Sequence, residues 1–266
     1  MLVDTHVGRL FVEVVGQGPP VVLWHSLLCD ADMWRAQRPV LGERWRLVLV
    51  DGPGHGRSAR TDRPYNLDDC TEAAVQLLDA LDVARAAWVG LSWGAMVGMR
   101  LAISRPERVG PLALLATSAR PDPPWKLAGY RALAAVARRL GPEPPLGRLV
   151  VPLMFGGDTR RTRPELVERF LERLSRMDPR SLGHAVDAVV LWRDDVSGSL
   201  GRIRSPVLVM VGAEDRATPP SEARRLCAAI PGARLVVIQG AGHLCALERP
   251  EAVNAELVDF LGAHSW

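Results

Sequence analysis

The most informative stretch of the chain is Gly90-Leu91-Ser92-Trp93-Gly94. It follows the apolar run 86–89 and precedes a helix-like segment, so the serine stands where a strand would turn into a helix. Glycines two positions on either side suit a turn so sharp that a Cβ at either one would collide with the neighbouring strand or helix. Such a nucleophile elbow holds a hydroxyl over the positive end of the following helix, where it can attack a substrate.

A serine hydroxyl needs a base to take its proton, and a histidine base needs a carboxylate to orient it. His243 follows the apolar run 235–238, and Asp215 follows the apolar run 207–211. Both would lie just past the carboxyl end of a strand, where sites in parallel sheets gather. Glu214 is the alternative carboxylate. Both residues could also be ordinary acids of a solvent-exposed loop without a catalytic role. We favour Asp215 because the loop that follows it suits an inward-facing side chain.

An oxyanion hole needs two backbone N–H groups aimed at the alkoxide that forms during attack. One should come from Trp93, the residue after the serine. The other should come from the loop after the apolar run 21–24, with Leu27 as the expected donor. His25 in the same loop is expected to fix the loop's shape through hydrogen bonds or to border the substrate pocket.

Short apolar runs alternate with helical patterns, which favours an α/β fold with a mostly parallel sheet covered on both faces. The expected strands are Leu10–Val15, Val21–Trp24, Leu47–Val50, Ala87–Gly90, Leu112–Leu115, Val207–Val211 and Leu235–Ile238. The expected helices between them are Ala31–Leu41, Leu67–Leu81, Trp93–Ser104, Ser221–Ala229 and Glu251–Leu261.

The alternation stops between residues 119 and 204, where the pattern is helical over 127–140, 164–175 and 181–192. The stretch opens on a proline-rich segment, 120–124, which suits a chain that leaves the core. A second such segment, 141–145, lies inside it. We therefore expect a core formed by residues 1–118 and 205–266 and an inserted helical lid at 119–204. The alternative is that these helices simply pack against the sheet.

Composition excludes several classes of protein. The 266 residues are 48% hydrophobic and 24% charged with a net charge of +3, which is ordinary for a globular enzyme. The arginines are scattered among acids, which argues against nucleic-acid binding. No signal peptide and no membrane-length apolar run are visible, so a cytoplasmic location is expected. The cysteines at 29, 70, 227 and 245 form no C-x-x-C pair, and neither they nor the histidines are spaced as metal ligands.

These residues together resemble the α/β-hydrolase superfamily over nearly the whole chain. The likeness rests on His-x-x at 25–27, Gly-His-Gly-x-Ser at 54–58, the elbow at 90–94, Gly-x-x-Asp at 212–215 and Gly-x-Gly-His at 240–243. It implies the α/β-hydrolase fold with an inserted helical lid. It also implies the roles of nucleophile for Ser92, orienting carboxylate for Asp215 and base for His243. Residues 25–27 and 33–37 look most like the 3-oxoadipate enol-lactonase and small carboxylesterase branch.

Two residues depart from what many members of that superfamily have. Ser26 stands where glycine is frequent, and Trp93 stands where a smaller or more flexible residue is common. A bulky indole beside the nucleophile would narrow or redirect the acyl pocket.

The sequence thus predicts a cofactor-free serine hydrolase that cleaves a small carboxylic ester or lactone through an acyl-enzyme on Ser92. Carbon–carbon bond hydrolysis, acyl transfer and perhydrolysis with the same triad remain open, as does a non-catalytic small-molecule receptor on this scaffold. A homodimer is also left open. The pocket should lie between sheet and lid, with candidate wall residues that core packing would explain equally well: His25, Trp34, Trp125, Met154, Phe155, Leu191 and Trp192.

Overall fold

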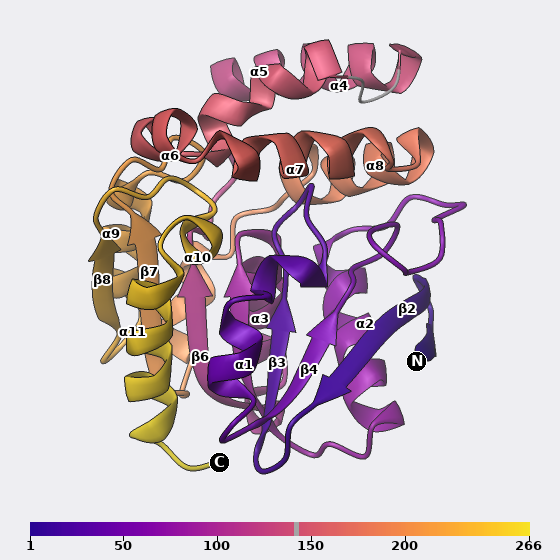
Figure 1. Cartoon of the computed structure of the whole chain (residues 1–266). Helices are drawn as coiled ribbons and strands as arrows, with labels where there is room; N and C mark the ends of the chain where they lie inside the picture. The colour runs from indigo at the N-terminus through magenta and orange to yellow at the C-terminus, as the bar shows by residue number, and fades with distance from the viewer. Residues whose placement is uncertain (141–143) are drawn as a thin grey trace.

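At the centre of the structure lies an eight-stranded sheet in the order β1-β2-β4-β3-β5-β6-β7-β8 (Figure 1). The structure is a computed structural model and describes residues 1–140 and 144–266. β2 pairs antiparallel with β1 and β4, and the other neighbours are parallel. The strands are β1 (Leu2–Thr5), β2 (Gly8–Val15), β3 (Pro20–Trp24), β4 (Arg46–Val50), β5 (Ala86–Leu91), β6 (Val109–Leu115), β7 (Val207–Gly212) and β8 (Arg234–Ile238).

Every strand predicted from the sequence is present, with its ends within a few residues of the expected ones. The strand that was not predicted is β1, a four-residue edge strand that pairs with β2. Only one of its residues, Val3, is buried, so it lacks the apolar run that marks the inner strands. The predicted α/β class with a mostly parallel sheet is confirmed.

Helices cover both faces of the sheet, and successive strand residues feed two separate cores. In β3, Val22 and Trp24 pack into one core, while Val21 and Leu23 pack into the other. The first core lies under α2 (Leu67–Ala80), α3 (Trp93–Ser104) and α9 (Pro220–Ala229). The second lies under α1 (Gln37–Leu41) and α11 (Pro250–Gly262). This two-sided burial explains why the inner strands are continuously apolar.

One predicted helix is wrong in part. The segment 31–41 was expected to be one helix, but it forms a 3₁₀ helix, η1 (Ala31–Trp34), and then the short helix α1. Pro39 explains the break, because its ring would clash with the carbonyl of residue 35 in a continuous α-helix. In α1 the proline lies in the first turn, where it is tolerated.

Between β6 and β7 the described chain is helical and lies over the end of the sheet to which the parallel strands point (Figure 1). Helices α5 and α6 were not expected, since Pro144 and Pro145 suggested a loop, although prolines are compatible with a first helical turn. Residues 141–143 of that proline-rich segment lie outside the described residues. The division into a core and a lid at 119–204 stays a prediction. The elements are α4 (Pro124–Leu140), α5 (Pro144–Met154), α6 (Gly157–Thr162), α7 (Pro164–Ser175), α8 (Pro179–Val186), the π-helical turn η3 (Asp187–Leu191) and the 3₁₀ helix η4 (Ser197–Arg202).

The turn from β5 into α3 is as tight as the two glycines predict. Ser92 has a φ of 52°. A Cβ on Gly90 would lie 2.2 Å from the carbonyl carbon of Gly94, and a Cβ on Gly94 would lie 2.1 Å from the carbonyl oxygen of Trp24 in β3. The predicted collision with helix and strand is confirmed at both positions.

Beneath this turn lies a buried group of rings. The Trp93 indole contacts Trp24, His25 and His55 with centroid distances of 5.9, 5.5 and 5.0 Å. Burial removes the imidazole of His55 from water and, with help from the neighbouring His25, lowers its pKa to about 3. Burial lowers the pKa of His25 as well. Both rings are therefore neutral in the folded chain at neutral pH.

A Gly94→Ala variant should have a free energy of unfolding lower by about 1–3 kcal/mol or more, because its methyl group overlaps the β3 backbone. Gly129→Ala is the matched control, since the added Cβ of this helical glycine would meet no atom within 4 Å beyond the neighbouring backbone of its own helix. That control should be about 1 kcal/mol more stable through its higher helix propensity. Urea denaturation measures both. A Gly94→Ala variant as stable as the parent would contradict the close approach.

Acid should destabilise the folded chain through His55. The folded-state pKa of about 3 lies below the ordinary value of 6.5, so the unfolded chain binds the proton first as the pH falls. The contribution of His55 is complete above pH 6.5 and is lost toward pH 3, with a slope of up to about 1.4 kcal/mol per pH unit. His55→Asn should flatten the loss of unfolding free energy measured between pH 6.5 and 4.5, whereas His264→Asn should not. Parallel curves for all three proteins would refute a neutral, buried His55.

Candidate active site

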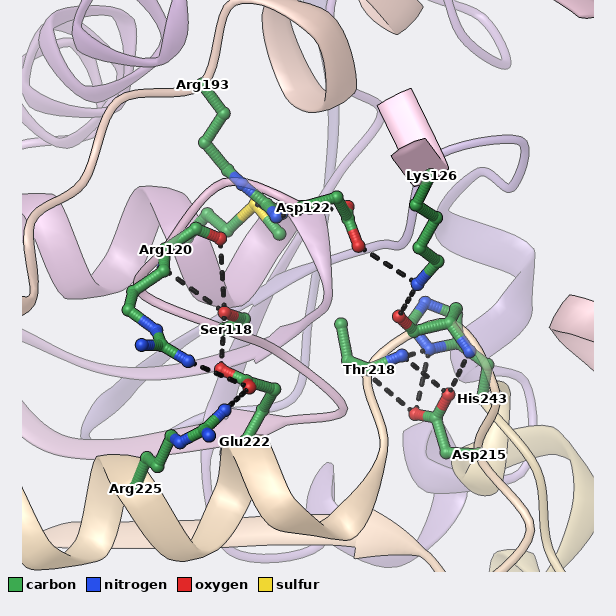
Figure 2. Close-up of polar contacts among 12 residues, drawn as sticks. Ser118, Arg120, Asp122, Lys126, Arg193, Asp215, Thr218, Glu222, Arg225 and His243 are labelled. Atoms are coloured by element: carbon green, nitrogen blue, oxygen red, sulfur yellow. Dashed lines mark hydrogen bonds and ion pairs between the residues drawn. The ribbon is translucent and has the colours of Figure 1, made fainter. Parts of the chain in front are cut away.

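Asp215 and His243 meet in the loops that follow β7 and β8 (Figure 2). His243 Nδ1 lies 2.9 Å from Asp215 Oδ2, and both side chains are buried. Thr218 Oγ1 donates to the same oxygen at 2.9 Å, and the N–H groups of Ala217 and Thr218 donate to Oδ1. An ionised carboxylate only accepts, so the proton of the ring sits on Nδ1 and Nε2 is left with a free lone pair.

Glu214, the alternative carboxylate, is turned away from this pair. Its Oε2 accepts a hydrogen bond of 2.6 Å from the N–H of Gly157 at the start of α6. Asp215, and not Glu214, is therefore the carboxylate in contact with His243.

Thr218 was not singled out from the sequence, although the order Asp-x-x-Thr is a signal for it. A carboxylate that accepts from backbone N–H groups two and three residues further on forms a local turn. That turn brings the threonine hydroxyl back onto the carboxylate. The loop after β7 thus holds its own acid in place.

A second buried carboxylate, Glu248 at the end of α10 (Cys245–Glu248), was also not predicted. Its oxygens accept from the N–H of Gly242, beside His243, at 2.9 Å and from the N–H of Gly156, before α6, at 2.8 Å. Burial raises the pKa of this carboxyl, and these hydrogen bonds oppose the rise. Glu248 therefore ties the histidine loop to the inserted helices. Glutamate is usually exposed, so nothing in its sequence context marks it.

Ser92 and His243 border the same cavity, whose volume is about 170 Å³. Ser92 is the residue before the first turn of α3, so the positive end of that helix faces it. Below, the cavity is bordered by loops of the sheet. Above, its wall is mostly apolar and comes from the inserted helices, through side chains that include Leu133, Val150, Leu153, Leu182, Val186 and Val189.

The loop after β3 borders this cavity through Ser26, Leu27 and Leu28. Leu28 has a φ of 67°, a left-handed conformation that is costly for leucine and folds the loop back over the site. The carbonyl of His25 accepts from the N–H of Gly94 at 3.1 Å, which fastens this loop to the elbow. Leu27 thus borders the same cavity as Ser92, and its role as an oxyanion donor stays a prediction.

His25 does not border the cavity; it is fully buried and shapes the loop. The N–H of Gly52 donates to His25 Nε2 at 2.8 Å, so Nε2 is the acceptor. His25 Nδ1 must then carry the proton and donate to the carbonyl of Ser26 at 2.7 Å. The structure therefore supports a role for His25 in fixing the shape of the loop, and not a role in bordering the substrate pocket.

Of the other predicted wall residues, only Met154 borders the cavity. Trp34 and Phe155 are buried in the core under α1 and α11. Trp125 and Trp192 are 77% and 56% exposed, and Leu191 lies outside the wall. The π-helical turn explains the misplacement at 191–192, because its extra residue rotates the following side chains. Arg193, not Trp192, faces the cavity as a result.

The Trp93 indole does not narrow the pocket, contrary to the prediction. It is fully buried in the ring group beneath the elbow and is absent from the cavity wall. Within the part of the chain that the structure describes, no three His, Cys, Asp or Glu side chains are grouped to hold a metal ion. No helix in that part is long and apolar enough to cross a membrane.

Comparison with known proteins agrees with this geometry. A 3-oxoadipate enol-lactonase from Acinetobacter baylyi is 29% identical over 236 residues, which cover 89% of this chain and 86% of that protein. The dihydrolipoyllysine-residue acetyltransferase component of an acetoin cleaving system from Pseudomonas putida is 32% identical over 97% of this chain and 68% of its own length. The structure of a thermophilic esterase from Thermogutta terrifontis, with malate bound, is 29% identical and superposes with a TM-score of 0.92 over 99% of this chain and 98% of that one.

The model of the α/β-hydrolase fold family matches residues 19–250, which include the elbow, the acid loop and the histidine loop. The expected resemblance is therefore confirmed. This chain belongs to the α/β-hydrolase family.

Proposed function

We propose that this hydrolase is a serine esterase or lactonase that forms an acyl-enzyme on Ser92. The observation that carries the proposal is the 2.9 Å contact between His243 Nδ1 and Asp215 Oδ2 beside a cavity that Ser92 also borders. A buried carboxylate on Nδ1 leaves Nε2 as the base, which is the arrangement that activates a serine.

In the proposed reaction, Ser92 Oγ attacks the carbonyl carbon while His243 Nε2 takes its proton. The N–H groups of Leu27 and Trp93 donate to the oxyanion, and each such donor is worth about 3 kcal/mol of transition-state stabilisation. His243 then protonates the leaving alkoxide. A water molecule, deprotonated by His243, releases the acid and restores Ser92.

The chemistry of the cavity supports an ester or lactone with an apolar acyl part. Most of its wall is aliphatic, which favours a hydrocarbon portion of the substrate beside the reacting carbonyl. The similarity to an enol-lactonase and to an esterase points the same way.

Acyl transfer is the second candidate, because the relative at 32% identity is named as an acetyltransferase component. The first half of the reaction would be the same, and an alcohol or thiol would then replace water as the acyl acceptor. Added alcohol or thiol should raise the yield of transfer product over free acid if this second route operates.

Hydrolysis of a short-chain 4-nitrophenyl ester tests the proposal. Ser92→Ala and His243→Ala should each lower kcat by about 10⁴-fold or more, because nucleophile and base act as one unit. Ser104→Ala, at the exposed far end of α3, is the matched control and should keep parental turnover.

Circular dichroism and thermal unfolding would show that each variant remains folded. Undiminished turnover in His243→Ala would show that the base is misassigned. Tight ligand binding that survives Ser92→Ala, with negligible turnover in the parent, would support a receptor instead.

A further inference from the structure

A polar group interrupts the apolar wall of the cavity. Arg193, Asp122 and Tyr130 border the cavity, and Arg193 is its one cationic wall residue among the described residues. Figure 2 shows Arg193 directed toward Asp122, with Lys126 on the other side of that carboxylate. The proposed hydrolysis uses none of these side chains.

The Arg193 guanidinium is buried but poorly satisfied. Its side chain is only 5% exposed, yet its contacts are Nη2 to Asp122 Oδ2 at 3.3 Å and Nη1 to the Met96 sulfur at 3.5 Å. A thioether is a weak acceptor, and Arg193 Nε has no hydrogen-bond partner. Buried polar groups are nearly always paired, so this guanidinium has donors left for a ligand.

Arg193 shares its carboxylate contact with a second cation. Asp122 is shared, since its Oδ1 lies 2.9 Å from Lys126 Nζ while its Oδ2 contacts Arg193. Lys126 also donates to the carbonyl of Ala217 in the acid loop at 2.8 Å. Two cations thus share one carboxylate, and the group keeps a net charge of +1. Buried charge of one sign is costly unless an opposite charge arrives to pair with it.

The neighbouring hollow on the far side of Asp122 contrasts with this. Its arginines Arg120 and Arg225 also share one carboxylate, Glu222, but their side chains are 42% and 59% exposed, so water can complete their hydrogen bonds (Figure 2). The incomplete pairing belongs to Arg193, which borders both spaces.

Arg193 is also at a useful distance from the nucleophile. Its Nη1 contacts Met96, which lies four residues after Ser92 and therefore about 6 Å further along α3. Ser92 and Arg193 also border the same cavity, so one small substrate can contact both.

We propose that Arg193 binds a carboxylate of the substrate, so that the enzyme prefers an ester or lactone bearing a second, negatively charged carboxylate a few carbons from the scissile carbonyl. The planar fork of arginine suits bidentate binding of a carboxylate, and the incoming charge balances the excess on Arg193 and Lys126. This inference rests on the proposed function, whose substrate class it narrows.

Matched substrates test the inference. The monoethyl esters of succinate, glutarate and adipate are compared, by titration of released acid, with the neutral ethyl esters of butyrate, valerate and hexanoate. The parent should favour at least one half-ester over its neutral counterpart in kcat/KM. Arg193→Gln should lower that preference by about 10- to 100-fold, mainly through KM, and leave the neutral esters little changed.

Two further variants sharpen the result. Arg193→Lys keeps the charge but not the fork and should retain part of the preference. Arg120→Gln removes an arginine from the neighbouring hollow and should leave the preference intact. No preference in the parent, or equal losses on charged and neutral esters in Arg193→Gln, would overturn the inference.

Binding separates this inference from the proposed function. Calorimetric titration of Ser92→Ala with monoethyl adipate and with ethyl hexanoate reports recognition without turnover. Tighter binding of the half-ester that disappears in Ser92→Ala/Arg193→Gln supports the carboxylate site even if hydrolysis fails. Equal binding of the two esters contradicts it even if Ser92 proves to be the nucleophile.

Discussion

The site depends on the contact between the Asp215 carboxylate and the His243 ring. Because backbone N–H groups and Thr218 hold the carboxylate from its own loop, its position does not rely on the histidine. The histidine loop is held separately, through Glu248. Two independently fixed loops therefore bring one imidazole to a defined tautomer, with its second nitrogen free of the carboxylate.

The sheet supplies the other half of this geometry. Parallel strands end at one edge, so loops from distant parts of the sequence meet there. The elbow adds a close approach that only glycine permits, and the carbonyl of His25 fastens the loop after β3 to the start of α3. The inserted helices contribute an apolar wall and one buried arginine. In the proposed function, the loops of the sheet carry the reaction chemistry and the inserted helices select the substrate.

Sequence patterns were sufficient for the inner strands and most flanking helices, because the inner strands are apolar on both faces. They also singled out Asp215 and His243, which the structure brings into contact. They failed where the position of a side chain depends on packing in the folded chain. Trp34 and Phe155 look like pocket aromatics but fill the core, and the register shift of a π-helical turn puts Arg193 at the wall. The buried carboxylate of Glu248 and the partly buried carboxylate of Asp122 each have one partner that is distant in the sequence, Gly156 and Arg193 respectively, which no local pattern reveals.

The most direct test of the account is covalent labelling with a fluorophosphonate, followed by mass spectrometry of the intact protein and its peptides. The account predicts a single adduct on Ser92, formed rapidly in the parent chain and far more slowly in His243→Ala. An adduct on another residue, or labelling of Ser92 at the parental rate without His243, would contradict the claim that this imidazole activates the hydroxyl.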